Sequence, residues 1–447
     1  MKSVLANYVV TPKIVLSGNV SNILIKPQGE HAAFGLKEYI AQFVPMSASR
    51  EPFYDYTTQN VAVGEDGCLR FSYLFTGEQE YKIRLFDPAD NEPDAQSPDR
   101  VLKPGKEKLD IRVYALHKDL YERRPYRGDF HTHSICSDGS EDPEITASNF
   151  RKSGFDFYAL TDHRRYWPSI RCKEYYSTKP VDFKVIAGEE VHAPNNHVHI
   201  VNFGGCESIN EMYEKDPERY DAEVREILAE LNAAGHKIAD GLEDYAYAYA
   251  SCLWVFRKIK EAEGLSIFCH PHWMADAYHI SDALTDTIFK GGGFDAFELL
   301  GGQEVYSNNL QTVYYYEKCA EGIKVPIVGV SDAHNTGDGA KWFNWTSTIV
   351  FAPDLELRSI IDSVKDFYSV AVETYPDEAS RVHASFRLVK YAKFLLEEYF
   401  PVHDELCYEE GRLMKAMYLG DRDAEPLLAG MRGRCDRLMR QYWGENL

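Results

Sequence analysis

The sequence predicts an α/β protein in which a central strand–helix region lies between a β-rich amino-terminal region and a helical carboxy-terminal region. Three observations predict this fold class. Short apolar runs separated by turn residues fill residues 1–124, apolar runs alternate with helical patterns over residues 125–377, and only helical patterns follow over residues 378–447. Repeated alternation of strands and helices is typical of a parallel barrel or a doubly wound sheet.

The amino-terminal region is expected to form a β-sandwich-like domain. Its strands are predicted from runs rich in Val, Ile, Leu, Tyr and Phe, which are Val9–Leu16, Asn19–Ile25, Glu38–Val44, Cys68–Phe75, Tyr81–Phe86 and Leu109–Ala115. Short strands at this spacing, separated by Gly, Pro, Asn and Asp, are typical of Ig-like sandwiches. His31 and His117 stand alone in this region, so we expect the domain to contribute no metal ligand.

Helices are predicted in the two regions that follow. In the central region, apolar spacing and helix-end signals predict helices over Asp142–Lys152, Ala222–Ala234, Tyr247–Ala262 and Ser307–Ala320. In the carboxy-terminal region, the same signals predict Arg381–Tyr399, Asp404–Met417 and Asp423–Trp443. These last helices could clasp the central region or form the contact of a homo-oligomer, and the pattern leaves both possibilities open.

Seven apolar runs of the central region end in residues that can bind metal. The ends are His131-Thr-His133, Asp162-His163, Glu189-Glu190, His199, His270-Pro-His272, Glu298 and Asp332-Ala-His334. Strand ends of this kind share one rim of a sheet or barrel, where α/β proteins place their chemistry. Neutral imidazoles and carboxylates suit Zn, Mn or Fe and leave positions for exchangeable solvent. The pattern therefore predicts a polynuclear metal site in an enzyme.

The ordered motifs resemble those of the polymerase and histidinol phosphatase (PHP) superfamily. Over about residues 126–340 they comprise His131-Thr-His133-Ser with Asp138, Leu-Thr-Asp162-His163, Gly-Glu-Glu190-Val, His199, His270-Pro and Asp332-Ala-His334. The resemblance implies a distorted (β/α)7 barrel whose strand carboxyl ends commonly hold three divalent ions, and an activity on phosphate esters. The Gly-Glu-Glu variant with a following histidine also resembles a branch that includes carbamate and ester hydrolases.

The resemblance further implies that nine ligands are divided among three ions. One ion would be bound by His131, His133, Glu190 and Asp332. A second would be bound by Glu190, His199 and His270, so that Glu190 would bridge the first two ions. The third would be bound by Asp138, His163 and His334.

Residues beside these ligands are assigned by the same pattern or by strand alternation. The family's Gly-x-Glu makes Glu190 the expected ligand, while Glu189 should face the opposite side of the strand and pack or form a salt bridge. The family aligns the following Ile-Val-x-Phe-Gly run with His199, which favours it over His197 on the same strand face. Glu298 is expected to be a carboxylate that orients an imidazole.

Four residues near the expected ligands are predicted substrate contacts. Arg164 and Arg165 directly follow a ligand-bearing strand end, where they would either hold an anionic group or belong to a solvated loop. His192, on the same strand face as the bridging glutamate, would donate to substrate or line the cleft. His272, two residues after a ligand, would be a neighbour of the site or a substrate contact. His279 lies outside the strand ends, and we expect it to be structural.

These motifs predict a metal-dependent hydrolase, and the resemblance favours a phosphoesterase that cleaves a small phosphorylated metabolite. A hydroxide bridging two ions of a trinuclear centre would attack the substrate, with Glu190 and Asp332 as the catalytic carboxylates. Hydrolysis of a carboxylic ester or carbamate at the same centre is one alternative, and a non-catalytic PHP-like binding module is another. The complete ligand set argues against the binding module, and Arg164 and Arg165 favour an anionic substrate.

Composition limits the partners that we expect. The formal net charge of -21 disfavours nucleic-acid backbones and anionic membranes, although a metal cluster can still attract a small anionic substrate. No stretch approaches the roughly 20 apolar residues of a membrane span, and the amino terminus lacks the apolar run of a signal peptide. Nine scattered cysteines favour a reducing compartment. The sequence therefore predicts a cytoplasmic protein.

Overall fold

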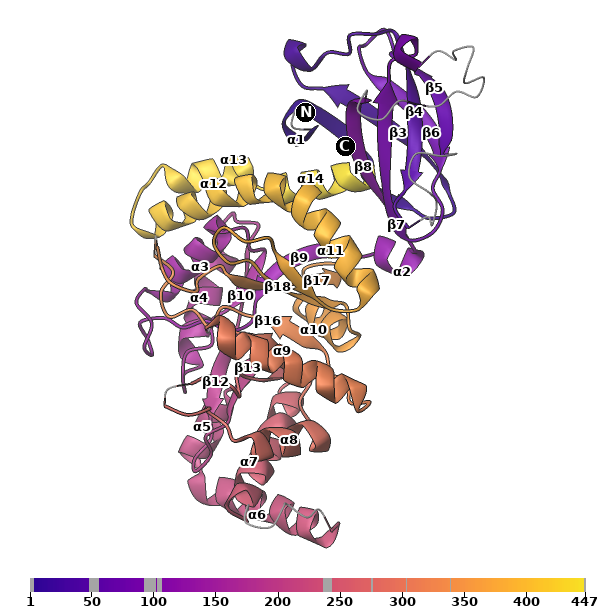
Figure 1. Ribbon diagram of the computed structural model, residues 1–447. Helices are drawn as coiled ribbons and strands as arrows, with labels where there is room; N and C mark the ends of the chain where they lie inside the picture. Colours follow the sequence, from indigo (N-terminus) through magenta and orange to yellow (C-terminus); the bar gives the residue numbers. More distant parts are fainter. Residues whose placement is uncertain are drawn as a thin grey trace. The chain divides into compact units, whose positions relative to one another are not determined.

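The computed structural model describes residues 4–47, 56–91, 102, 107–235, 243–274, 276–302, 304–337 and 339–445. The chain forms two compact units (Figure 1). Unit 1 comprises Met1–Arg124, Phe386–His403 and Gly433–Leu447, and unit 2 comprises Pro125–Ser385 and Asp404–Arg432. The carboxy-terminal region that the sequence predicts over residues 378–447 therefore contributes to both units.

Unit 1 contains two sheets that share one hydrophobic core. The first has the order β1-β3-β6, with β1 at Tyr8–Thr11, β3 at Val20–Pro27 and β6 at Leu69–Leu74. The second has the order β2-β8-β7-β4-β5, with β2 at Ile14–Leu16, β4 at Glu38–Pro45, β5 at Thr57–Ala62, β7 at Gln79–Phe86 and β8 at Glu107–Leu116. Ile25 and Phe71 of the first sheet belong to the same core as Phe43, Ile83 and Ile111 of the second. Each sheet therefore buries one face against the other.

Helices complete unit 1. They are α1 (Val4–Asn7), the 3-10 helices η1 (Glu30–Ala32) and η2 (Ala89–Asn91), α2 (Lys118–Tyr121), α11 (Phe386–Glu398) and α14 (Arg434–Trp443). Arg387 in α11 donates to Asp119 at 2.6 Å and to Glu78 at 2.8 Å. The rings of Tyr391 in α11 and Tyr114 in β8 lie 5.0 Å apart. Ion pairs thus attach α11 to α2 and to the residue before β7, and aromatic packing attaches it to β8 of the second sheet.

Unit 2 also contains two sheets. One has the order β11-β10-β9-β17-β18-β19, with β9 at Arg124–Asp129, β10 at Phe157–Ala159, β11 at Lys184–Ile186, β17 at Thr346–Ala352, β18 at Ser369–Glu373 and β19 at Arg381–His383. The other has the order β12-β13-β14-β15-β16, with β12 at Gly188–His192, β13 at His199–Phe203, β14 at Leu265–Phe268, β15 at Ala296–Leu300 and β16 at Ile327–Gly329. Strand β19 replaces the start of the helix predicted from Arg381, because Val382 pairs with Val372 of β18.

The two sheets of unit 2 meet over a common core, to which Phe157, Ile186, Val201, Ile267 and Val328 all belong. Isolated parallel bridges also join the segments that follow the strands, between Thr132 and Ala333 and between His163 and Glu190. The mixed α/β fold class is confirmed. A single closed (β/α)7 barrel is not confirmed, because the strands form two hydrogen-bonded sheets that include antiparallel pairs such as β12–β13 and β17–β18.

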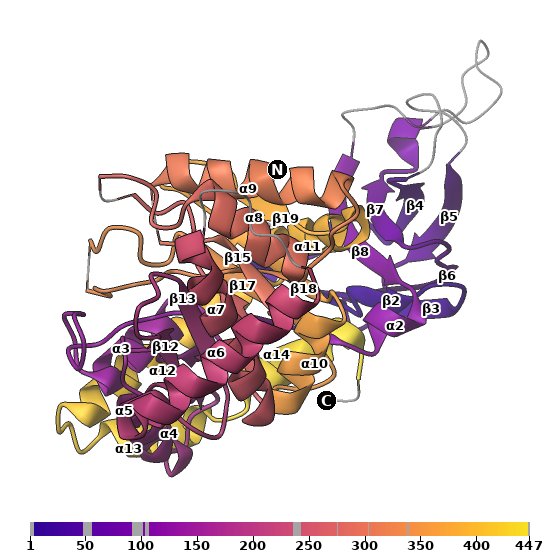
Figure 2. The same ribbon diagram turned by 90° about the horizontal axis from the view of Figure 1, so that it is seen from below.

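Helices follow most strands of unit 2. They are α3 (Pro143–Lys152), α4 (Trp167–Ser177), α5 (Ile209–Lys215), α6 (Pro217–Ala233), α7 (Glu243–Glu261), α8 (Asp282–Gly291), α9 (Val305–Ala320) and α10 (Leu357–Lys365). The four helices predicted in this region are confirmed as α3, α6, α7 and α9. Helices α6 and α7 lie side by side in both views (Figures 1 and 2), and Trp254 Nε1 donates to Glu223 at 2.7 Å between them. Among the described residues, no helix combines the length and the apolar character needed to cross a membrane.

Two carboxy-terminal helices pack on the strand–helix region of unit 2. They are α12 (Phe400–Tyr418), which belongs to unit 2 from Asp404 onward, and α13 (Ala424–Met431). Met414 and Leu428 share a core with Phe150 of α3. Arg151, which is completely buried, donates from Nε to Glu410 of α12 at 2.8 Å. Of the two arrangements that the sequence leaves open, packing on the strand–helix region is therefore observed for these helices.

The close approach of α12 to α3 generates a stability prediction. A Cβ atom on Gly411 would lie 2.1 Å from the main-chain nitrogen of Lys152, so we expect Gly411→Ala to lower the free energy of unfolding by about 1–3 kcal/mol. Gly430 in α13 meets nothing within 4 Å, so Gly430→Ala should be neutral or stabilising by up to about 1 kcal/mol through helix propensity. Urea unfolding midpoints compare the two variants. Equal midpoints would contradict the packing of α12 on α3.

Candidate metal centre

The nine predicted ligands lie at one rim of the strands in unit 2. His131, His133 and Asp138 follow β9, and His163 follows β10. Glu190 lies in β12 and His199 is the first residue of β13. His270 follows β14, and Asp332 and His334 follow β16. Strand β13 runs antiparallel to β12 and β14, so its first residue lies at the rim where β14 ends. The topology therefore brings all nine side chains to the same end of the two sheets.

Glu190 is the hub of this arrangement. It is completely buried, and each of its carboxylate oxygens faces a different set of histidines. Oε1 lies 2.8 Å from His199 Nδ1 and 3.2 Å from His270 Nε2. Oε2 contacts His163 Nδ1 and lies 3.5 Å from His131 Nε2. This division between two sets is what a carboxylate needs if it is to bridge two cations.

Four groups of ligand atoms lie around this hub, and in each group the atoms lie within 4.8 Å of one another; one of them is His131, Cys269 and His270, and the other three are as follows. The first group is His131, His133 and Asp332. The second group is His199, His270 and His279. The third group is His133, Asp138, His163 and His334. The first group contains three of the four residues that the resemblance assigns to the first ion, without Glu190, and the third group contains all three assigned to the third ion, with His133 added. The second contains an additional histidine that the sequence pattern did not select.

Individual distances show how tightly the first and third groups converge. Asp332 Oδ1 lies 2.9 Å from His133 Nε2 and 3.4 Å from His131 Nε2. In the third group, the two oxygens of Asp138 lie 3.3 Å from His163 Nε2 and 3.4 Å from His334 Nε2. Each carboxylate is therefore placed between two imidazoles, as in sites that bind divalent cations through nitrogen and oxygen.

Several buried ligand atoms, including some that lie close to another ligand, form no hydrogen bond of normal geometry among the described residues, which tests whether a cation fits here. They include His131 Nε2, Glu190 Oε2, His199 Nδ1 and His279 Nε2. Leaving a buried polar atom without a partner costs about 1–3 kcal/mol. A divalent cation would bind these converging lone pairs, so the residues present suit Zn, Mn or Fe.

The pKa values of the ligands are shaped by burial and by Glu190. Burial lowers the pKa of His133 to about 4 and the pKa of His199 to about 3, which keeps both imidazoles neutral, as metal ligation requires. Burial opposes ionisation of Glu190, but the positive charges of His131 and His163, whose pKa values are raised, outweigh it and hold the pKa of Glu190 well below its usual range. Burial also opposes protonation of His163, yet Glu190 raises its pKa to about 10. A cation would supply the positive charge that a proton on His163 otherwise supplies.

Two buried carboxylates outside the ligand groups position the ligands, one by contacting a histidine ring and the other by accepting from main-chain nitrogens. Glu298 Oε2 lies 2.9 Å from His131 Nδ1, which leaves Nε2 of that ring facing the centre. Asp129 accepts from the main-chain nitrogens of His131 at 3.0 Å and Ser331 at 2.9 Å. It thereby ties the segment after β9 to the segment after β16, and these two segments carry five of the nine predicted ligands.

Glu189 faces away from Glu190, into a set of hydrogen-bond donors. Its carboxylate accepts from Asn210 Nδ2 at 2.7 Å, from Ser208 Oγ at 2.8 Å and from the main-chain nitrogen of Ile209 at 2.5 Å. These partners lie at the start of α5. Glu189 therefore anchors a helix, and its side chain takes the strand face opposite to the ligands.

Two ligands lie in strained main chain. The φ angle is +25° at His270 and +47° at Asp332, in a region that side-chain-bearing residues rarely adopt. A Cβ atom on Gly302 would lie 1.5 Å from the carbonyl oxygen of Ser331, so only glycine allows the segment after β16 to take this path. The main chain is thus bent where it aims two ligands at the centre.

The arginines predicted to contact substrate line a cavity beside the third group. This cavity has a volume of about 540 Å³ and is lined by Ser137, Asp138, His163, Arg164, Arg165, Tyr166, Trp167, Glu211 and Glu214. Arg164 and Arg165 are both exposed. Within the part of the chain that the structure describes, neither guanidinium group makes a hydrogen bond or an ion pair. Two unengaged cations therefore stand beside the metal ligands.

The two histidines predicted to contact substrate lie in different surroundings. His192 Nε2 is 2.9 Å from His163 Nδ1, and the His192 ring stacks on His199 with centroids 3.8 Å apart. His192 therefore lines the metal centre. The His272 ring packs against Tyr278 and Tyr314, with centroids 5.5 and 5.6 Å away. His272 faces α9, and its role as a substrate contact stays a prediction.

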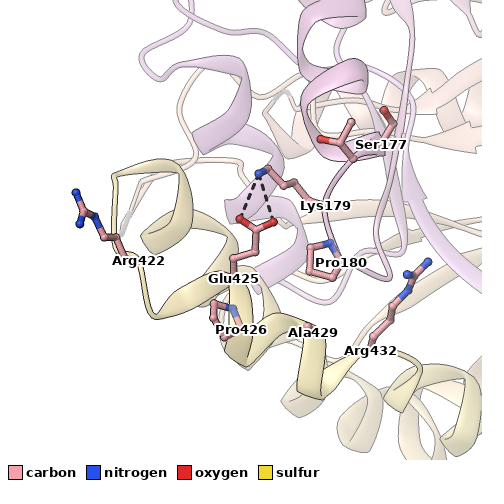
Figure 3. Close-up of a pocket in the computed structure, with 9 residues that line it drawn as sticks. Ser177, Lys179, Pro180, Arg422, Glu425, Pro426, Ala429 and Arg432 are labelled. Carbon is pink, nitrogen blue, oxygen red and sulfur yellow. Dashed lines mark hydrogen bonds and ion pairs between the residues drawn. The ribbon is translucent and has the colours of Figure 1, made fainter.

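A separate cavity of about 650 Å³ lies between the end of α4 and α13 (Figure 3). It is lined by Ser177, Thr178, Lys179, Pro180, Arg422, Glu425, Pro426, Ala429 and Arg432. Lys179 Nζ lies 3.3 Å from Glu425 Oε2 in an ion pair, and Arg422 points away from it (Figure 3). With one carboxylate and no histidine or cysteine in its lining, this cavity lacks the donors of a metal site.

The two adjacent glutamates should respond differently to substitution. We expect Glu190→Gln to remove bound metal while the protein stays folded, because a neutral amide offers one acceptor oxygen and cannot bridge two cations. Glu189→Gln should retain metal but lower the unfolding free energy by about 1–3 kcal/mol, because the amide NH2 would meet donors. Metal content per chain and thermal unfolding measure both effects. Loss of metal in Glu189→Gln together with full metal content in Glu190→Gln would reverse the assignment.

Comparison with known proteins gives partial structural overlaps only. No protein-family profile and no curated protein sequence matches the chain. A two-domain Bacteroides vulgatus protein with a region assigned as a PHP-like metal-dependent phosphoesterase overlaps with a TM-score of 0.39 and 18% identity, over 56% of this chain and 65% of that chain. A Bifidobacterium adolescentis protein assigned as a metal-dependent phosphoesterase (TM-score 0.32, 16% identity) and a Chromobacterium violaceum amidohydrolase (0.30, 19%) each overlap over 48% of this chain and 89% of theirs.

The structural neighbours of the chain thus include PHP-like metal-dependent phosphoesterases and an amidohydrolase, all at low identity. The first of these overlaps leaves about a third of the neighbour's length unmatched. Because the TM-scores are low, the assignment of the site rests on the geometry of its own residues.

Proposed function

We propose that the chain is a metal-dependent hydrolase, and specifically a phosphoesterase that cleaves a small phosphorylated metabolite at a centre of up to three divalent ions. A distorted PHP-type barrel would carry this centre. The observation that supports the proposal most strongly is the gathering of eight His and Asp side chains around the buried Glu190 carboxylate. A chain without such chemistry would gain nothing from burying this carboxylate among imidazoles.

The chain's own residues would hold the ions in defined positions. The first ion would bind His131, His133, Glu190 and Asp332; the second Glu190, His199 and His270; and the third Asp138, His163 and His334. Divalent ions bound there would activate a water as nucleophile and stabilise negative charge on phosphoryl oxygens. The complete set of donors supports an enzyme rather than a non-catalytic binding module.

Hydrogen bonds fix the tautomers that binding requires. The ring nitrogen His131 Nδ1 is 2.9 Å from Glu298, and His334 Nδ1 is 2.8 Å from the carbonyl oxygen of Asp332. Each ring would donate from Nδ1, so Nε2 would present its lone pair to the centre. Glu298 and the Asp332 carbonyl are thus positioning groups for the two imidazoles.

An anionic substrate is supported by Arg164 and Arg165. Both line the cavity that reaches Asp138 and His163, so an anion held by a guanidinium group would lie next to the third ligand group. Carboxylic ester or carbamate hydrolysis would use the same metal centre but would leave the arginines without a partner. The proposed partner is therefore a small anionic molecule rather than a nucleic-acid backbone or a membrane.

The metal centre and its reaction can be tested together. We expect purified protein reconstituted with Mn, Zn or Fe to bind two to three equivalents per chain, and to hydrolyse phosphomonoesters faster than carboxylic esters. Phosphodiesters serve as a third substrate class. Protein that binds no metal and gains no activity on its addition would exclude the proposed function, whereas activity confined to carboxylic esters would select the alternative.

The arginines offer a sharper test of substrate charge. Arg164→Ala or Arg165→Ala should lower kcat/KM for a phosphomonoester by about ten- to a hundredfold, because each loses one charge-assisted contact of about 1.5–3 kcal/mol. Metal content should not change, since arginine is not a ligand. The exposed Lys173 of α4 lies outside the cavity lining, so Lys173→Ala is the matched control for lost positive charge. Wild-type kcat/KM in both arginine variants would contradict anion binding.

A further inference from the structure

His279 enters the second ligand group from a turn rather than from a strand end. Its ring centroid lies 4.3 Å from that of His199 and 5.7 Å from that of His270. One ring nitrogen of each of these histidines lies within 4.8 Å of the others. The three imidazoles therefore surround one point, next to the Oε1 atom of Glu190, which is 2.8 Å from His199 and 3.2 Å from His270.

The position of His279 is fixed by main-chain hydrogen bonds. The main-chain nitrogen of His279 donates to the carbonyl oxygen of Trp273 at 2.7 Å, and the main-chain nitrogen of Ile280 donates to the carbonyl oxygen of Pro271 at 3.1 Å. Ile280 is 2% exposed and belongs to a hydrophobic core. The ring of Trp273 lies 5.4 Å from that of His279. Hydrogen bonds at His279 and at the next residue thus fix the main chain that carries the imidazole.

The two ring nitrogens of His279 have different surroundings. The imidazole forms a hydrogen bond to the main chain of His197, while Nε2 is buried and has no hydrogen-bond partner among the described residues. A histidine that is hydrogen-bonded to main chain and has a buried, unpaired ring nitrogen beside a cluster of ligand atoms has the arrangement of a metal ligand. A purely structural histidine would leave Nε2 unsatisfied, at a cost of about 1–3 kcal/mol.

We propose that His279 is a fourth protein ligand of the second ion, together with Glu190, His199 and His270. This inference rests on the proposed function, because it assumes that the centre binds divalent ions. Four nitrogen and oxygen ligands fill the coordination shell of an ion such as Zn²⁺ and characterise closed sites, whereas catalytic sites keep a position open. The second ion would therefore serve to hold Glu190, as would the first, which also has four protein ligands, and substrate would reach the third ion, whose three protein ligands leave a position open.

The cavity beside the centre agrees with this division. Its lining includes Asp138 and His163 of the third ligand group and neither His199, His270 nor His279 of the second. The approach for a small molecule thus lies on the side of the third group. The side chains of the third group are also more exposed than those of the second: His163, His334 and Asp138 are 26, 39 and 55% exposed, against 17% for His199 and 5% for His270.

Metal binding to His279 variants tests the proposal without depending on activity. His279→Ala and His279→Asn, reconstituted with Zn²⁺ and dialysed against a graded series of chelator, should lose one equivalent of metal or bind it at least about tenfold more weakly; removing groups that merely support a ligand already costs about 10–100-fold. Co²⁺-loaded protein gives a second readout. The visible absorption of four-coordinate Co²⁺ should weaken in both variants, since solvent would replace the imidazole.

His272→Ala is the matched control, because His272 is a buried histidine close to His279 in sequence and its ring packs on Tyr278 and Tyr314. It should retain the metal content and the Co²⁺ spectrum of the wild type. Circular dichroism identifies which of the two His279 variants is folded, and the second substitution serves if the first is not. Folded His279 variants with wild-type metal retention and spectrum would overturn the proposal. A wild-type chain that binds no metal would instead exclude the proposed function.

Discussion

The burial of one ionised carboxylate is the constraint on which the site depends. Glu190 has no exposed surface, and an isolated charge in such a place would be strongly unfavourable. Histidines from four other strand ends or starts surround it, so its charge is compensated from both sides of the carboxylate. Because β12 carries Glu190 where the two sheets of unit 2 meet, the positions of both sheets determine which side chains surround this carboxylate.

Further buried carboxylates accept hydrogen bonds from the segments around the ligands and hold the rim in place. Asp129 links the segments after β9 and β16, and Asp162 accepts from Ser134 N at 2.8 Å and Ser137 Oγ at 2.6 Å in the loop that carries Asp138. Glu189 holds the start of α5. Much of the negative charge near the centre is therefore buried and structural. The acidic residues beside the ligands in sequence position the main chain, while the ligands themselves face inward.

The sequence predicted the direction of the candidate ligands where strand geometry determines it. Alternation along β12 separates Glu189 from Glu190, and the structure places them on opposite faces as expected. The same reasoning could not place His270 and His272. Strand β14 ends at Phe268, and φ of +25° at His270 redirects the chain, so the two-residue spacing no longer implies a shared face. His279 carries no periodic signal at all, because its turn is formed by main-chain hydrogen bonds.

Long-range pairing set the other limit on prediction. Apolar periodicity identified α3, α6, α7 and α9, but α4 buries only Pro168, Ser169, Cys172 and Tyr176, which is too polar a set to mark a helix. Periodicity also identifies carboxy-terminal helices without showing what they cover; Met414 and Arg151 reveal that contact only in the folded chain. Whether strands close into one barrel depends on hydrogen bonds between segments far apart in sequence, and local patterns do not encode them.

The site is asymmetric, and this asymmetry bears on substrate size and charge. A cavity of about 540 Å³ falls within the range of about 300–1,000 Å³ typical of small-molecule sites. Arg164 and Arg165 line it together with Glu211 and Glu214, so it presents positive charge next to the third ligand group and negative charge as well. A molecule with several anionic groups would meet these glutamates. For the proposed phosphoesterase, a substrate with one anionic group and a neutral or cationic remainder would therefore suit the charges of this cavity better.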